Sequence, residues 1–251
     1  MRDYLAWRLA FGVTTPSTNT VCQPEYDSFR PEGVTNHIAR MVIDDNPVNS
    51  DEDFAQQIED INAALEDAVD RVMDAKPNAF ILGISALAVW GGTVEWGEEL
   101  KQRVRKVAGW DIPVTIASDA VVAALRAHGV KQNIAIMEPY YPVIEPKLRG
   151  VLGHYGYEIL NFCHMRGKSP GSYSVLTAQD MIKAVKSIDS DDVEAIVAFG
   201  ANLPFARLAD EAERWLDKPV IQINSCTYWH ALLSNGINDK VYGYTQLLSK
   251  F

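Results

Sequence analysis

Small hydroxyl and amide side chains follow three short apolar runs, and these residues are the ones from which chemistry can be expected. They occupy residues 14–19 (TTPSTN), 83–85 (GIS) and 200–202 (GAN). Hydroxyl and amide groups donate hydrogen bonds, and donors of this kind stabilise negative charge as it develops during a reaction. The pattern therefore favours a pocket for a small carboxylate.

A tyrosine and three titratable side chains follow other expected strands. Tyr140 stands in the segment Glu138-Pro139-Tyr140, directly after an apolar run, and His164 follows a later one. Tyr140 is a candidate donor to a carboxylate or an oxyanion, with core packing as the alternative. Glu138, His164 and Asp119 are candidate acids or bases, with a structural or solvated role as the alternative for each.

Each candidate at the three strand ends also has a structural alternative. Asn19 and Ser85 could cap helices, and Asn202 could serve a turn. The candidate catalytic residues are Tyr140, Ser85, Glu138 and His164, and the candidate substrate-binding residues are Pro16, Ser17, Asn19, Gly83, Ile84, Gly200, Ala201 and Asn202. We expect no metal and no cofactor, because the sequence offers no ligand spacing for zinc, no phosphate-binding glycine loop and no hydrolase triad.

The elements that must position these residues alternate between strand and helix. Apolar strands are expected near residues 8–13, 35–43, 79–82 and 112–116, and the clearest amphipathic helix spans 51–73. The order then restarts with strands near 133–137, 157–162, 195–199 and 220–223. The sequence therefore predicts an α/β fold of two pseudo-symmetric αβα lobes, each with a parallel four-stranded sheet, and an active site in the cleft between them.

The lobes are expected to divide the chain unevenly, with residues 1–123 and 229–251 in the first and 124–228 in the second. The 251 residues carry a formal net charge of -10, which argues against nucleic acid and anionic membranes as partners. No signal peptide or spanning run stands out, and three cysteines form a sparse set. We expect a cytoplasmic protein with free thiols, a small carboxylate as substrate, and a homo-oligomer as a further option.

Several of these segments resemble a known superfamily. Residues 12–20 (GVTTPSTNT) resemble the first-strand motif of maleate cis-trans isomerases, residues 138–140 (EPY) resemble their Pro-Tyr motif, and residues 200–203 (GANL) resemble their Cys-Thr-Asn-Leu segment. Arylmalonate decarboxylase is similar over the same stretches and over 210–220. The resemblance covers nearly the whole chain, belongs to the aspartate/glutamate racemase superfamily, and implies an active site between two lobes.

The same resemblance exposes a departure, because both cysteine positions of the superfamily are occupied by glycine. Gly83 matches the first-lobe position and Gly200 the second, while Cys22, Cys163 and Cys226 match neither. Two-base chemistry by a cysteine pair is therefore excluded. We expect the glycines to flank the ligand, to leave space where relatives carry a thiol, and to tolerate Gly200→Cys.

Three functions stay open on these grounds. The leading one is a cofactor-independent enzyme that acts on a small carboxylate or dicarboxylate, as an isomerase, a decarboxylase or a hydrolase, by a cysteine-free variant of the superfamily mechanism. The second is a catalytically inactive protein that binds or senses a small carboxylate. The third is a structural partner in an oligomer, for which the six tryptophans and ten tyrosines could supply an interface.

Overall fold

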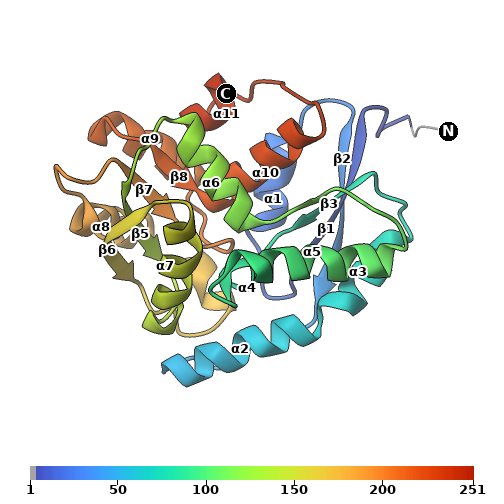
Figure 1. Ribbon diagram of the computed structural model, residues 1–251, viewed down its shortest axis with the longest axis horizontal. Coiled ribbons are helices and arrows are strands. Elements are labelled where there is room, and N and C mark those ends of the chain that lie inside the picture. Colours follow the sequence, from blue (N-terminus) through green and yellow to red (C-terminus); the bar gives the residue numbers. More distant parts are fainter. Residues whose placement is uncertain (1–3) are drawn as a thin grey trace.

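A computed structural model describes residues 4–251 as two lobes, each built on a four-stranded parallel sheet (Figure 1). The strand order is β2-β1-β3-β4 in the first sheet and β6-β5-β7-β8 in the second. The strands are β1 (Leu9–Pro16), β2 (Val34–Met41), β3 (Ala79–Leu82), β4 (Val114–Thr115), β5 (Asn133–Glu138), β6 (Glu158–His164), β7 (Ala195–Ala198) and β8 (Val220–Gln222). The predicted fold class is thus confirmed.

Helices cover both faces of the first sheet. On one face α3 (Leu65–Met73) and α5 (Val94–Ala108) pack together, and on the other α1 (Cys22–Phe29) contacts α10 (Ile223–Ser234). The remaining helices of this part are α2 (Asp51–Ala63), α4 (Ala86–Val89) and α6 (Ala117–Ala127). Every residue of the central strand β1 is buried as a result, which explains the apolar run over residues 9–13.

The second sheet is covered by α7 (Glu145–His154), α8 (Ala178–Ile188) and α9 (Ala206–Leu216). Two short 3-10 segments, Pro142–Ile144 and Gly171–Val175, flank the strands β5 and β6, and α11 (Gln246–Lys250) ends the chain. Thr177 opens α8 with a reciprocal capping box to Asp180, which satisfies two backbone donors at that terminus.

The long amphipathic segment 51–73 is two helices and not the single helix that its periodicity predicts. Ser50 caps α2 by accepting a hydrogen bond from the backbone N–H of Asp53, as its side-chain type indicates. The helical hydrogen-bond pattern then breaks at Ala64, and α3 starts at Leu65. After the break α3 packs on the first sheet, while α2 contacts the 3-10 segment Pro142–Ile144 of the second lobe and lies below both lobes in the view of Figure 1.

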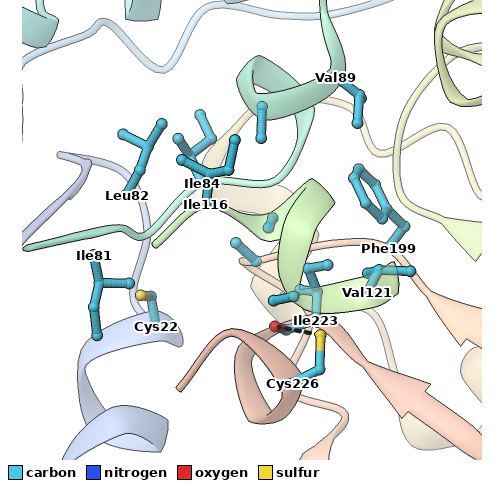
Figure 2. Packing of buried hydrophobic residues seen from close by; sticks show 14 of the residues in the cluster. Cys22, Ile81, Leu82, Ile84, Val89, Ile116, Val121, Phe199, Ile223 and Cys226 are labelled. Atoms are coloured by element: carbon cyan, nitrogen blue, oxygen red, sulfur yellow. Dashed lines mark hydrogen bonds between the residues drawn. The ribbon is translucent and has the colours of Figure 1, made fainter. Parts of the chain in front are cut away.

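A continuous apolar core joins the two lobes. Figure 2 shows Phe199, at the end of β7, beside Val121 of α6 and close to Ile223 of α10. Cys22 and Cys226 lie in the same core, fully buried, and the thiol of Cys226 donates a hydrogen bond to the carbonyl oxygen of Ile223. Helix α10 therefore starts at the second sheet and packs against the first.

Polar contacts also connect the lobes around the cleft. The loop between β2 and α2 is held by the loop after β6, because the Val48 N–H donates to the Lys168 carbonyl and the Gly171 N–H donates to Asp45. The Tyr141 hydroxyl donates to the carbonyl of Val48 from the second lobe. These bonds fix the cover of the cleft on one side.

Glu25 forms a further contact between the lobes, on α1. Its carboxylate accepts hydrogen bonds from the backbone N–H of Ala206 and from the side-chain amides of Gln222 and Asn224, all from the second half of the chain. No cation pairs with it among residues 4–251. Burial therefore raises the pKa of Glu25 to about 7, although the three donors oppose this.

The predicted division into residues 1–123 with 229–251 and residues 124–228 stays a prediction, and its boundaries fall within α6 and α10. None of the helices within residues 4–251 is long and apolar enough to cross a bilayer. The cytoplasmic location also stays a prediction.

The contact of Glu25 predicts a specific pH dependence of stability. Because its pKa is raised from 4.5 to about 7, its contribution is fully present below 4.5 and is lost as the pH rises through about 7. We expect the unfolding free energy of the wild type to fall across this window more steeply than that of Glu25→Gln, as measured by urea denaturation. The exposed Glu32→Gln is the control, and parallel curves for the wild type and Glu25→Gln would contradict the prediction.

Candidate active site

A small cavity lies between the lobes, where the carboxyl ends of the central strands of both sheets meet. Residues that follow β1, β3, β5 and β7 supply four parts of its wall, and α2 and the loop after β6 close it. The lining residues are Pro16, Thr18, Asn19, Gln57, Ile58, Ile61, Ile84, Ala86, Tyr140, Pro170, Tyr173, Ala201 and Asn202. Its water-accessible space is about 30 Å³, enough for about two water molecules.

Two hydroxyls and one backbone amide from opposite lobes meet beside this cavity, where Tyr140 and Ala201 line the wall and Ser85 lies directly behind it. The Ser85 and Tyr140 hydroxyl oxygens lie 2.8 Å apart, and the Ala201 N–H donates to Ser85 Oγ at 3.2 Å. Ser85 precedes α4 after the first sheet, whereas Tyr140 and Ala201 follow strands of the second. The structure therefore brings together Ser85, Tyr140 and Ala201, which the sequence placed in one site.

Burial keeps both cavity tyrosines protonated. The pKa values of Tyr140 and Tyr173 are raised well above their ordinary range, mainly because each phenol is removed from water. The hydrogen bond with Ser85 opposes this for Tyr140 without cancelling it. Since the mutual bond between Ser85 and Tyr140 uses only one of their two hydroxyl hydrogens, one donor remains for a ligand.

Asn19 combines its structural alternative with a place in the cavity. Its Oδ1 accepts hydrogen bonds from the backbone N–H groups of Val21 and Cys22, which caps the start of α1. This cap leaves Nδ2 without a hydrogen-bond partner among residues 4–251, in a side chain only 3% exposed. The Asn19 amide nitrogen is therefore a second available donor in the wall.

Both polar atoms of the Asn202 side chain, Oδ1 and Nδ2, already form hydrogen bonds within the protein. Its Oδ1 accepts from the Thr20 N–H, and its Nδ2 donates to the Pro170 carbonyl at 3.0 Å and weakly to that of Thr18. Two of these partners belong to the first lobe and one to the second. Asn202 therefore holds the lobes in register while it lines the cavity.

Glu138 and His164 form a pair outside the cavity wall. The Glu138 carboxylate is fully buried, pairs with His164 Nδ1, and accepts a hydrogen bond from the backbone N–H of Tyr140. His164 Nε2 also lies 3.5 Å from a carboxylate oxygen of Glu145. Burial raises the pKa of Glu138, and the hydrogen bond with Glu138 raises the pKa of His164. The pair fixes the backbone that carries Tyr140, and neither side chain lines the cavity.

The expected empty space beside the two glycines is absent, and this expectation was wrong. A Cβ atom on Gly83 would lie 2.9 Å from Cys22 Sγ and 2.9 Å from the Thr14 carbonyl oxygen. On Gly200 it would lie 2.7 Å from Pro139 Cδ and 2.8 Å from Leu203 Cδ1. Neighbouring atoms therefore occupy the space that a side chain at either glycine would need. Only the residues after the glycines, Ile84 and Ala201, line the cavity.

The nearby Cys22 thiol does not supply a base beside Gly83. Cys22 is fully buried and lies outside the cavity wall. Burial raises the pKa of its thiol to about 12, so that it stays protonated at neutral pH. It fills the space beside Gly83 and offers no base there.

Two further candidates lie away from the cavity. The exposed Ser17 hydroxyl donates to the Ile43 carbonyl and thereby anchors the start of the loop after β2, while its neighbour Thr18 lines the cavity. Asp119 pairs with Lys101 at 2.9 Å and does not reach the wall. Ser17 as a direct ligand and Asp119 as a base therefore have no support in the cavity geometry.

Sequence reasoning missed part of the wall that comes from α2 and the loop after β6. Gln57 is buried, its Oε1 accepts a hydrogen bond from the Tyr173 hydroxyl at 2.9 Å, and its Nε2 has no partner among residues 4–251. Ile58 and Ile61 share its helix. Their helical spacing identified a buried face, but the sequence alone could not distinguish a face toward the core from one toward a cavity.

The cavity wall as a whole is uncharged and rich in donors. The thirteen lining residues include no carboxylate, amine, imidazole or thiol. Within the part of the chain that the structure describes, no group of three or more His, Cys, Asp or Glu side chains could hold a metal ion. The arrangement can hold a small anion by neutral donors and can stabilise negative charge on it.

The comparisons with known proteins identify the family. An arylmalonate decarboxylase family model matches residues 50–248, most of the chain. The chain therefore belongs to the arylmalonate decarboxylase family, as its motifs predict. A comparison with curated protein sequences finds no significant match.

Solved structures of the same fold match over nearly the whole chain. A variant of Nocardia farcinica maleate cis-trans isomerase with a covalently bound succinylcysteine intermediate is 22% identical, with 97% of this chain and 99% of that chain covered and a TM-score of 0.85. A variant of the Pseudomonas putida maleate isomerase Iso with maleate is 21% identical, with 96% of this chain and 97% of that chain covered and a TM-score of 0.84. A liganded variant of arylmalonate decarboxylase is 20% identical, with 96% of this chain and 99% of that chain covered and a TM-score of 0.78.

The filled space at Gly200 predicts the effect of restoring a thiol there. The backbone of Gly200 is not in the left-handed region, so the limit on Gly200→Cys is space alone. We expect the substitution to lower the unfolding free energy by about 1–3 kcal/mol, as an overpacked core residue does.

Urea denaturation measures this loss. Gly153→Ala is the matched control, since a Cβ at this exposed helical position meets nothing within 4 Å, and it should stabilise the protein by about 0.5–1 kcal/mol. A Gly200→Cys variant as stable as the wild type would show that the site accepts a side chain after all.

Proposed function

We propose that this protein is a cofactor-independent enzyme that decarboxylates a small malonate-type diacid without a cysteine. The observation that carries the proposal is a buried cavity whose wall has hydrogen-bond donors on both lobes and no side chain that could act as a base at neutral pH. Membership of the arylmalonate decarboxylase family supports the same reaction class.

The available donors suit a carboxylate. The leftover hydroxyl hydrogen of the Ser85–Tyr140 pair and the Asn19 amide are available at one small volume. The Ala201 N–H, which donates to Ser85 Oγ, becomes a third donor when a ligand displaces that bond. A carboxylate accepts several such bonds at once, and bonds to a charged acceptor are about twice as strong as neutral ones. No lining cation is needed, because these dipoles are already fixed by the fold.

Decarboxylation fits this wall better than proton abstraction does. An isomerisation or racemisation that starts with a thiolate needs a group that the wall lacks, and the relative with a succinylcysteine intermediate forms that adduct on a cysteine. Loss of carbon dioxide needs no base. It needs only that the electron pair left behind be stabilised and then protonated.

The reaction then proceeds in two steps. The bond between the central carbon and one carboxylate breaks, carbon dioxide leaves, and the electron pair becomes an enediolate on the carboxylate that the donors hold. The carbon then takes a proton from the Ser85–Tyr140 hydroxyl pair, which water reprotonates. Ile58, Ile61 and Ile84 form an apolar wall beside the donors, where a charged leaving carboxylate is poorly solvated and its loss as a neutral gas is favoured.

The size of the cavity restricts the substrate. Its water-accessible space is only about 30 Å³, and we expect a bound diacid to part the walls or to separate the Ser85–Tyr140 pair. Gln57, Tyr173 and Pro170 form the cover that such a ligand displaces. A small substituent on the malonate is therefore favoured over an aryl ring.

The second candidate function is a binding protein without catalysis. The filled spaces beside Gly83 and Gly200 and the protonated tyrosines favour it, because they leave a donor site with no reactive group of its own. The two candidates differ in product formation and share ligand binding, so one assay separates them.

The proposed reaction is tested with methylmalonate, malonate, phenylmalonate and maleate. We expect carbon dioxide release from the small malonates, with deuterium incorporated at the central carbon in heavy water. Tyr140→Phe should lower kcat by about 10²–10³-fold, as loss of an oxyanion donor does. The control Tyr242→Phe, on a tyrosine that is 76% exposed, should leave kcat unchanged.

Two outcomes contradict the proposal. Saturable binding of a small malonate without carbon dioxide release would establish the binding protein in place of the enzyme. If the protein neither binds nor converts any compound of the panel, the proposed carboxylate site is contradicted as well.

A further inference from the structure

Strand β2 forms one edge of the first sheet, so that only one of its two sides pairs with another strand of that sheet. Its six middle residues are partly exposed, whereas every residue of its neighbour β1 is buried. Val42, directly after the strand, is apolar and 67% exposed. No strand within residues 4–251 pairs with this outer side.

The outer side presents a regular row of unused backbone groups. The carbonyls of Gly33 and Met41 accept bonds from Leu9 and Ser17, so that the odd-numbered residues of β2 face β1. Since neighbouring residues of a strand point in opposite directions, the N–H and C=O groups of Asn36, Ile38 and Arg40 point outward. No backbone group of these three residues has a partner on that side in the described chain.

The edge strand β6 of the second sheet carries a bulge that disfavours pairing with a further strand, and β2 carries none. In β6 the register shifts by one residue, so that Leu160 bulges out of the ladder, and Arg149 bonds the Ile159 carbonyl. Bulges and edge charges are devices that prevent pairing between sheets. The register of β2 against β1 is unbroken over eight residues, and the strand contains no proline and no bulge, so that it stays straight enough to pair although it carries Arg40.

We propose that β2 is a self-association site, on which a second copy of this chain docks its own β2 antiparallel across a twofold axis at Ile38. In this register residue Asn36 faces Arg40 of the second copy, and Val34 faces Val42 of the second copy. The Asn36–Arg40 and Ile38–Ile38 pairs then exchange backbone N–H and C=O bonds, because the backbone groups of these residues point outward. Val34 adds no backbone bond, since its N–H donates to the Pro31 carbonyl and its C=O accepts from Arg30. The two four-stranded sheets become one sheet of eight strands.

The side chains of β2 complement themselves in this register. Arg40 reaches only neutral oxygens, of Asn19 and Gln23, and has no carboxylate partner within residues 4–251. At the other end of the strand Asn36 donates to Asp27, a carboxylate that pairs with no cation in the same range. The twofold sets each unpaired arginine beside the unpaired acid of the other copy, and it sets Ile38 against Ile38 at the centre.

Sedimentation velocity over a concentration series tests the association. We expect the wild type to be a dimer of the 27.9 kDa chain, and Ile38→Lys to weaken dimerisation by about tenfold or more, because two lysines then face each other at the axis. Val175→Lys, on a valine that is 74% exposed elsewhere, is the control and should stay dimeric. Circular dichroism verifies that each variant is folded.

Disulfide trapping tests the register. Residues 37 and 39 of opposite copies face each other between the hydrogen-bonded pairs, so that the double variant His37→Cys/Ala39→Cys should oxidise to a covalent dimer. Each single variant should not exceed the wild-type background, because its cysteine faces a histidine or an alanine. A monomer at every concentration, a dimer undisturbed by Ile38→Lys, or cross-linking of the single variants as efficient as that of the double variant would each overturn the proposal.

Discussion

The contact of Ser85 with Tyr140 and the Ala201 amide is the interaction on which the rest of the site depends. These groups meet because the carboxyl ends of two parallel sheets face each other, so that residues after β3, β5 and β7 converge. The Glu138–His164 pair fixes the backbone that carries Tyr140, and the bonds of Asn202 and Glu25 hold the two lobes at the spacing that this contact requires. The contact helps to make the cleft a site lined by uncharged donors.

Gly83 and Gly200, which the sequence motifs match to two cysteine positions of the superfamily, limit the chemistry that we propose for this cavity. Cys22 and Leu203 close the spaces that side chains at Gly83 and Gly200 would need, so the cavity is walled by donors and apolar groups alone. A wall without a base favours reactions that begin with bond cleavage over reactions that begin with proton removal. The fold is shared with maleate isomerases, while the proposed chemistry follows from the residues that differ.

The sequence identified the strand ends that form the site, but not the residues of α2 and of the loop after β6 that close it. Apolar runs that end in small polar residues identify buried parallel strands and their carboxyl ends, which is why Asn19, Tyr140 and Asn202 could be placed in one site. The roles of Gln57 and Tyr173 could not be foreseen, since a helix face toward a cavity has the same periodicity as one toward the core. The space at Gly200 depends on Pro139 and Leu203, and no pattern in the sequence reports such packing.

A crystal structure of the protein soaked with methylmalonate tests the central claim most directly. The account predicts one carboxylate of the ligand within hydrogen-bond distance of Tyr140 Oη, Ser85 Oγ and the Ala201 nitrogen, with the other carboxylate against Ile58, Ile61 and Ile84. The Ser85 and Tyr140 oxygens should then lie farther apart than the 2.8 Å of their direct contact. A cavity that stays closed, or a ligand bound elsewhere on the molecule, would contradict the account.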